Sequence, residues 1–226
     1  NIHLVKPGMK SVDVINYYDG STVTIPLDVK QSPAKNAQHY FKKYGKAKTA
    51  VKEKQIQLEE NENEINYLES VLAFLENTDD VNEIESIRSE LVETGYVRRR
   101  KQQGGFKEKK YKPAPHRYTL SNGMTVLVGK NNKENDYLTL KTAGSRDLWL
   151  HTKDIPGSHV IVQSGGQELD EKAIFEAAAI AAYHSKARTS ENVPVDYVPV
   201  KYVKKPARAK PGMVIFTNNR TVWVNP

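Results

Sequence analysis

A seven-residue hydrophobic repeat in the first third of the chain constrains its fold more than any other feature. Its main positions are Tyr44, Val51, Leu58, Ile65 and Leu72. The alternate positions hold Ala47, Leu68 and Leu75, and are interrupted by Lys54 and Asn61. A repeat kept over about four heptads predicts a coiled-coil helix. Ser32 as N-cap and Pro33 as first helical residue place its start, so a helix over 33–76 would be about 66 Å long.

A second, shorter helix is expected directly after this one. Asp80 and Glu83 have the spacing of a capping box, and Gly95 is a typical helix stop. An apolar stripe lies between them, at Val81, Ile84, Ile87 and Leu91. Residues 32–95 are therefore predicted to form a long antiparallel coiled-coil hairpin. Because its second arm is much shorter, the N-terminal half of the first arm is expected to need another partner.

Residues 1–31 read as a β-hairpin that turns at Asp19-Gly20, a pair suited to positive φ. A lone two-stranded hairpin is marginal in water, so we expect it to be the remnant of an upstream region or to pack on the next helix. The chain begins without Met and without a signal-peptide pattern, and we expect it to be a piece of a longer protein.

Residues 113–226 form a second module with a different pattern. Segments 116–120 and 124–129 flank a Ser-Asn-Gly turn, and residues 170–188 predict a helix that is apolar almost all round and therefore buried. Further strands are expected at 137–142, 148–151, 159–163, 197–203, 213–217 and 221–225. The predicted class is α+β: the coiled-coil hairpin followed by a mainly antiparallel sheet carrying one buried helix.

Charge is divided unevenly along the chain, whose net charge is +7. Residues 35–54 carry seven Lys against one Glu, residues 55–93 carry twelve acids against one Arg, and residues 94–112 carry eight bases against one Glu. The last of these stretches overlaps a predicted basic linker, 96–112, made flexible by Gly104-Gly105. Clustered bases indicate a polyanion binder, with solvated surface as the alternative, and the acidic tip of the coil is expected to contact a protein.

Several function classes find no support in the residues. Cysteine is absent, which excludes disulfides and thiolate zinc sites, and no apolar run reaches the ~20 residues that span a bilayer. The spacing of His151, Asp154 and His159 fits no metal site, and Ser158 and His159 as strand neighbours point to opposite faces. We therefore expect no enzymatic activity, no cofactor and no membrane span.

RNA binding is the chemistry for which residues are present. Aromatic rings stack on bases, and lysine and arginine contact phosphates. The candidate RNA-binding residues are Arg146, Trp149, His151, Lys153, His159, Lys201, Lys204, Lys205, Arg208 and Lys210. The alternative for Trp149 is a core aromatic, and for His151 a buried, hydrogen-bonded histidine.

Two segments carry a resemblance to a known family. Asp147-Leu-Trp-Leu-His-Thr-Lys-Asp-Ile-Pro-Gly-Ser-His-Val-Ile-Val162 resembles the hallmark of the NFACT-R domain, and Ile25–Asp28 with Ser32–Tyr44 resembles the segment that opens the middle coiled coil of the NFACT family. The resemblance implies a non-enzymatic cytoplasmic factor of ribosome-associated quality control. Its implied partners are the obstructed large ribosomal subunit and tRNA, and its implied role is to support C-terminal alanine tailing of stalled peptides.

The resemblance also leaves an adhesion role open. Some family members are reported as surface proteins that bind fibronectin although they have no signal peptide, so cell-surface location is an alternative to the cytoplasm. This sequence shows no repeat array of the kind that adds strands to fibronectin modules. A third interpretation is a general polyanion binder without preference for the ribosome.

Overall fold

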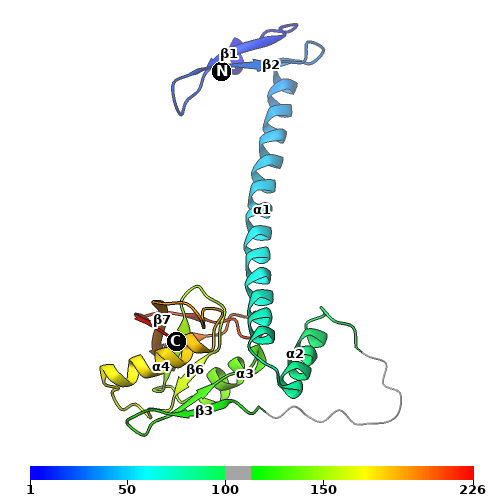
Figure 1. Cartoon of the computed structure of the whole chain (residues 1–226). Helices are drawn as coiled ribbons and strands as arrows, with labels where there is room; N and C mark the ends of the chain where they lie inside the picture. The colour runs from blue at the N-terminus through cyan, green and yellow to red at the C-terminus, as the bar shows by residue number, and fades with distance from the viewer. Residues whose placement is uncertain (100–112) are drawn as a thin grey trace. The chain divides into compact units, whose positions relative to one another are not determined.

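The computed structural model describes residues 1–99 and 113–226 in two compact units, Asn1–Glu62 and Asn63–Pro226. The predicted linker 96–112 lies mostly outside the described residues. The long helix α1 (Pro33–Glu76) was predicted with these bounds, and it contributes residues 33–62 to the first unit and 63–76 to the second (Figure 1). No helix in the described residues is long and apolar enough to cross a membrane.

The first unit is the predicted hairpin joined to the start of α1. A short 3-10 helix, η1 (Ile2–Leu4), precedes strands β1 (Ser11–Ile15) and β2 (Thr22–Pro26), which pair antiparallel across a turn where Gly20 has φ +70°. The Tyr40 hydroxyl donates to Pro26 O at 2.6 Å, and the Asn36 side chain both accepts from Asp28 N and donates to Asp28 O. The hairpin therefore packs on the helix that follows it, which is one of the two expected alternatives.

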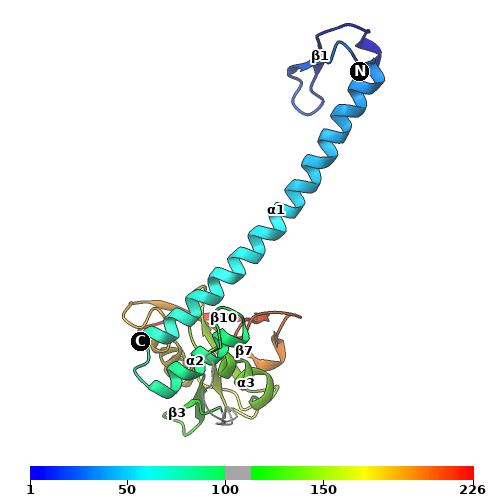
Figure 2. The same cartoon turned by 90° about the vertical axis from the view of Figure 1, so that its right-hand side faces the viewer.

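The second helical arm is α2 (Val81–Glu93), capped by Asp80 and stopped at Gly95, where φ is +89°. Figure 2 shows it alongside the last turns of α1. A small core joins the two helices and the segment after them, and it consists of Tyr67, Val71, Phe74, Ile87, Leu91 and Tyr96. The antiparallel hairpin is thus confirmed at this end of α1.

The predicted seam of the coil is not the buried one. Ile65 is 56 % exposed and Leu72 50 %, and Tyr44, Val51, Leu58, Leu68 and Leu75 are also exposed. The side chains that α1 buries against α2 belong to a neighbouring stripe, Tyr67, Val71 and Phe74. The heptad pattern identified the helix correctly but assigned the wrong face to the contact with α2, because α1 carries apolar residues on two faces.

A six-stranded antiparallel sheet organises the rest of the second unit. Its order is β10-β7-β5-β6-β4-β3. The strands are β3 (His116–Thr119), β4 (Thr125–Val128), β5 (Leu148–Thr152), β6 (Val160–Val162), β7 (Val193–Pro199) and β10 (Arg220–Val224). Helix α4 (Glu171–Tyr183) packs its alanines, Ala173, Ala177, Ala178, Ala181 and Ala182, on one face of the sheet, over a core of valines. The buried helix and the antiparallel sheet were both predicted.

The opposite face of the sheet has a different cover. Helix α3 (Asn132–Tyr137), the π-helical segment η2 (Leu138–Thr142), the 3-10 helix η3 (Val200–Tyr202) and the ribbon β8 (Val203–Lys204)–β9 (Ile215–Phe216) supply it. The predicted strand at 137–142 is wrong. The side chain of Asn131 accepts from Glu134 N at 2.9 Å and caps a helix there, so this helix start overrides the alternating pattern of the following residues.

Candidate nucleic-acid interface

The hairpin at residues 147–162 forms the centre of the sheet. β5 and β6 pair in the register Leu148–Val162, Trp149–Ile161 and Leu150–Val160. Trp149 is only 1 % exposed and packs against Phe216, with ring centroids 4.8 Å apart. The prediction that Trp149 stacks on an RNA base is therefore wrong, because no face of its ring is accessible. The alternative of a core aromatic is correct.

The two histidines of the hairpin are also structural. His159 is 2 % exposed, its Nδ1 lies 2.8 Å from Thr139 Oγ1, and its backbone N–H donates to Asn135 Oδ1. Burial lowers the pKa of His159 well below its usual value, and burial also lowers the pKa of His151. Neither ring therefore supplies the positive charge that a phosphate contact needs near pH 7, so their inclusion in the RNA-binding set is corrected.

Two of the predicted RNA-binding lysines already make polar contacts with other residues of the chain. Lys205 Nζ forms an ion pair with Asp136 Oδ2, and Asp136 Oδ1 accepts from Gly212 N at 3.1 Å. Lys210 Nζ lies 3.0 Å from the Tyr96 hydroxyl and 5.5 Å from the centroid of the Tyr67 ring. These two amines hold the C-terminal loop against α3 and the helical hairpin. They are removed from the candidate phosphate contacts.

The acidic end of the helical hairpin lies against the basic module of the same unit. Lys130 pairs with Glu83 at 2.8 Å, Lys133 with Glu93 at 2.8 Å, and Lys186 with Glu69 at 3.7 Å. The expectation of a free acidic tip reaching a separate protein is corrected for these residues, because the chain itself provides the cations.

Five predicted cations remain exposed: Arg146, Lys153, Lys201, Lys204 and Arg208. Within residues 1–99 and 113–226 none of the five forms an ion pair. Arg146 and Lys201 are brought together from distant parts of the sequence, because Lys201 N donates to Ser145 O at 3.0 Å and Val200 N donates to Asp147 O at 2.9 Å. We call these two residues the Arg146–Lys201 pair.

The carboxylate beside this pair is turned inward. Asp147 is 6 % exposed, and its two oxygens accept from Gly144 N at 2.8 Å and Gly165 N at 2.9 Å. The stem of Arg146 lies over Gly166, where φ is +92° and a Cβ would come within 3.0 Å of Arg146 Cδ. The loop thus supports the stem of Arg146 and leaves its charge exposed. Lys201 Nζ lies 4.9 Å from the centroid of the Tyr202 ring, so an aromatic residue accompanies this cation.

One exposed aromatic residue is missing from the sequence-derived candidates. Trp223 in β10 is 56 % exposed, while its neighbour Val224 is buried and Val222 packs on the same core. The alternation of Val222, Trp223 and Val224 is the sequence signal that places the indole on the face opposite to α4.

Two family models together match nearly the whole chain. The model of the NFACT N-terminal and middle domains matches residues 1–111, and that of the NFACT protein RNA binding domain matches residues 114–218. The chain is 47% identical over 228 residues to Rqc2 homolog RqcH of Bacillus subtilis (strain 168), and 45% identical over 226 residues to that of Streptococcus suis (strain 05ZYH33). Each alignment covers 100% of this chain and 40% of the relative, so the chain spans less than half of either protein.

A solved structure resembles the chain in three dimensions. It is that of the C-terminal part of the fibronectin/fibrinogen-binding protein from Streptococcus suis, with 44% sequence identity and a TM-score of 0.77. The match covers 87% of this chain and 77% of that one.

Proposed function

This chain belongs to the NFACT family, with parts of its middle region and its RNA-binding domain, and we propose that it is the RNA-binding portion of a ribosome-associated quality-control factor. The observation that carries the proposal is the Arg146–Lys201 pair. These two exposed cations are separated by 54 residues in the sequence. Backbone hydrogen bonds bring their chain segments together, and one of these bonds joins Lys201 N to Ser145 O at 3.0 Å.

The electrostatics around the pair favour a polyanion. Residues 197–226 contain no Asp or Glu, but they contain Lys201, Lys204, Lys205, Arg208, Lys210 and Arg220. Lys205 and Lys210 are used within the chain, and the others remain exposed. Exposed cations held close together by the fold can contact phosphates, and such contacts supply most of the sequence-independent affinity for nucleic acid.

Family membership and this surface support a finer proposal. We propose that the RNA is ribosomal or transfer RNA on an obstructed large subunit, and that the full-length protein supports alanine tailing there, in the cytoplasm. The chain would bind and position, and the ribosome would perform the chemistry. The histidines of the central hairpin support a non-catalytic role, because His159 is buried and hydrogen-bonded to Thr139, and the partly buried His151 stacks on the Trp149 ring.

The test measures RNA affinity of the whole chain across a series of salt concentrations. Replacing Arg146 and Lys201 together with Gln should reduce the slope of log K against log [salt] by about 1.4, since each single-strand phosphate contact contributes about 0.7. A control is Lys172→Gln, because Lys172 is also exposed but lies on α4, and its Nζ is 3.9 Å from Glu176 Oε1. An unchanged slope in the double variant would remove the pair from the interface.

Cosedimentation with purified large subunits addresses the ribosomal part of the proposal. The chain should pellet with intact subunits at low salt and lose this association in the double variant. Pelleting that is equal with any long RNA would replace the ribosomal assignment by general polyanion binding.

Fibronectin binding is a second candidate, favoured by the 44% identity to a protein named for binding fibronectin and fibrinogen. Specific fibronectin binding should saturate at physiological salt, survive nuclease treatment and persist in the Arg146→Gln, Lys201→Gln variant. RNA binding has the opposite signature in all three measurements, so one set of samples distinguishes the two functions.

A further inference from the structure

Trp223 occupies an unusual place for a tryptophan, on an edge strand and more than half exposed. β10 is the last strand of the six-stranded sheet and pairs only with β7, in the register Val222–Val195, Trp223–Pro194 and Val224–Val193 among the residues described. Val222 and Val224 pack into the core beneath α4. Because side chains alternate along a strand, the core contacts of the two valines fix Trp223 on the opposite face, at 56 % exposure.

A cation lies in the same row of that face. Lys153 directly follows β5, and its N–H donates to Pro194 O at 2.9 Å, while Pro194 is the register partner of Trp223. The row across three strands is therefore Lys153, Pro194 and Trp223. Lys153 is exposed and forms no ion pair within the described ranges 1–99 and 113–226.

The next row of residues along the strands is not accessible to a ligand. Asp196 is 3 % exposed and its Oδ1 accepts from Thr221 Oγ1 at 2.6 Å. The row after that contains Trp149 and Val198, which are buried beneath the cover of this face. The open part of the sheet face is thus a ledge at one end of β10, β7 and β5, with the indole of Trp223 on it and the exposed residue Lys153 in the same row.

We infer that this ledge is a stacking site for an unpaired base of single-stranded RNA, with the indole of Trp223 against the base and Lys153 near an adjoining phosphate. The inference rests on the proposed RNA-binding function and adds a second contact region to it. Exposed aromatic rings on a sheet, next to lysines, are what single-strand binders use, because every base offers a flat face for stacking. The Arg146–Lys201 pair lies at the other end of β5, six residues from Asp147 to Lys153, or about 20 Å at 3.3 Å per residue.

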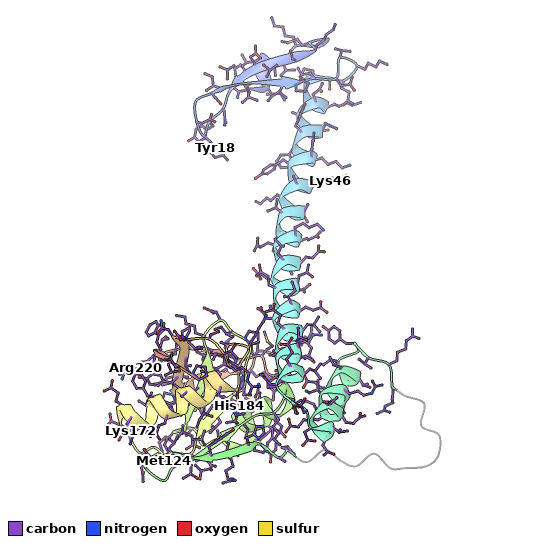
Figure 3. All side chains as sticks on the ribbon, viewed as in Figure 1. Tyr18, Lys46, Met124, Lys172, His184 and Arg220 are labelled. Carbon is purple, nitrogen blue, oxygen red and sulfur yellow. The ribbon has the colours of Figure 1, made fainter. Side chains whose placement is uncertain are left out.

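Single-stranded RNA is favoured over a docked peptide strand by charge. The C-terminal thirty residues lack acids altogether, and the exposed Lys153 lies in the row of Trp223. Arg220 (Figure 3) alternates with Val222 on β10 and therefore lies on the α4 side of the sheet, away from the ledge. A peptide adding to the β10 edge would need the backbone of the strand rather than its indole. The two occupants therefore differ in their dependence on the Trp223 side chain.

Fluorescence offers a direct readout, because the chain has two tryptophans and only Trp223 is exposed. The difference between the emission of the native chain and of Trp223→Phe isolates Trp223 without altering the core. A 12-residue oligouridylate should quench this component in step with binding. Trp223→Ala should weaken binding about 5- to 150-fold, the range for the loss of one base stack.

Two further variants distinguish stacking from general apolar contact. Trp223→Phe should keep most of the affinity, while Trp223→Leu should lose nearly as much as Trp223→Ala. Equal affinity of all four chains, with dependence on the Arg146–Lys201 pair retained, would overturn the stacking site and leave the proposed function intact. Absence of RNA binding by the native chain would overturn both. A matching duplex that binds as tightly as the single strand, or equal losses in the Phe and Leu variants, would overturn the assignment to an unpaired base.

Discussion

The Tyr67 hydroxyl donates a hydrogen bond of 2.8 Å to Glu90 Oε1, and thereby joins the last part of α1 to α2. Glu90 is 1 % exposed, and burial raises the pKa of its carboxyl. Asn132 Nδ2 lies 3.2 Å from the same oxygen, and Lys133 N donates to Oε2 at 3.3 Å. The buried carboxylate therefore connects both helices to α3 in the sheet module, which explains why residues 63–76 and 81–93 belong to one compact unit with the sheet.

Replacing Tyr67 with Phe should destabilise the second unit by about 1–3 kcal/mol, because Glu90 would keep its burial and lose its shortest donor. Urea unfolding monitored by circular dichroism measures the change. Tyr137→Phe is the control, since Tyr137 is 44 % exposed and its hydroxyl has no hydrogen bond within the described ranges, and it should change stability by less than about 0.5 kcal/mol. Equal losses in both variants would show that Glu90 does not depend on Tyr67.

Phe74 and Leu72 lie only two positions apart on α1 but on different faces, so we expect their substitution to change stability by very different amounts. Phe74 is 6 % exposed in the core with Ile87, and Leu72 is 50 % exposed. Phe74→Ala should therefore cost about 3–5 kcal/mol, while Leu72→Ala should stay below about 0.5 kcal/mol in this chain. The comparison uses the same urea titration. A large loss at Leu72 with none at Phe74 would restore the seam that the heptad repeat predicts.

Much of this fold follows from local patterns. The turns at Asp19-Gly20 and in residues 121–123, the caps at Ser32 and Asp80, and the alanine face of α4 are short-range signals, and the structure has each element where they indicate. The buried face of α1 and the helix at 132–142 could not be found in this way. Each depends on a partner far away in sequence, namely Ile87 for Phe74 and the sheet for Leu138.

The candidate site shows the same division between local and distant information. Sequence charge identifies Lys201, Lys204, Lys205 and Lys210 as one basic run, but it does not reveal that Asp136 and Tyr96 occupy two of them. Trp149 stands in the most distinctive motif of the chain and is buried, whereas Trp223 stands in an ordinary-looking strand and is exposed. The whole fold decides which face of a sheet is covered. The solvent exposure of each tryptophan could therefore not be predicted from its local sequence.

Lys204 and Lys205 provide a matched pair for separating stability from RNA binding. Lys205→Ala should cost about 1–3 kcal/mol, because it leaves the half-buried Asp136 without its cation, and should change the salt slope of RNA binding little. Lys204→Ala should leave stability within about 0.5 kcal/mol and reduce the slope by about 0.7, since Lys204 is exposed. Urea titrations and the salt series together check both statements. The reverse assignment, with RNA binding lost only at Lys205, would contradict the ion pair as the main role of that lysine.

Four histidines of the second unit make its stability depend on pH. Burial lowers the pKa of His116, His151, His159 and His184, and that of His184 falls to about 4. In the unfolded chain each histidine gains a proton as the pH falls below about 6.5, whereas the folded protein resists protonation until the lower folded-state pKa. Stability from these groups is therefore fully present above pH 6.5 and is lost as the pH falls from about 6.5 towards 4.

His184 gives this dependence a residue-level test. Its Nε2 lies 2.7 Å from the Tyr118 hydroxyl, and its ring stacks on His116 at 5.1 Å. His184→Gln should flatten the loss of stability between pH 6.5 and 4 by about 2–3 kcal/mol, because a glutamine binds no proton in either state. Glu90 acts in the opposite direction, since its raised pKa reduces stability as the pH rises above about 4.5. If the free energy of unfolding of the native chain decreases as the pH is raised from 4 to 6.5, the effect of Glu90 outweighs that of the four histidines.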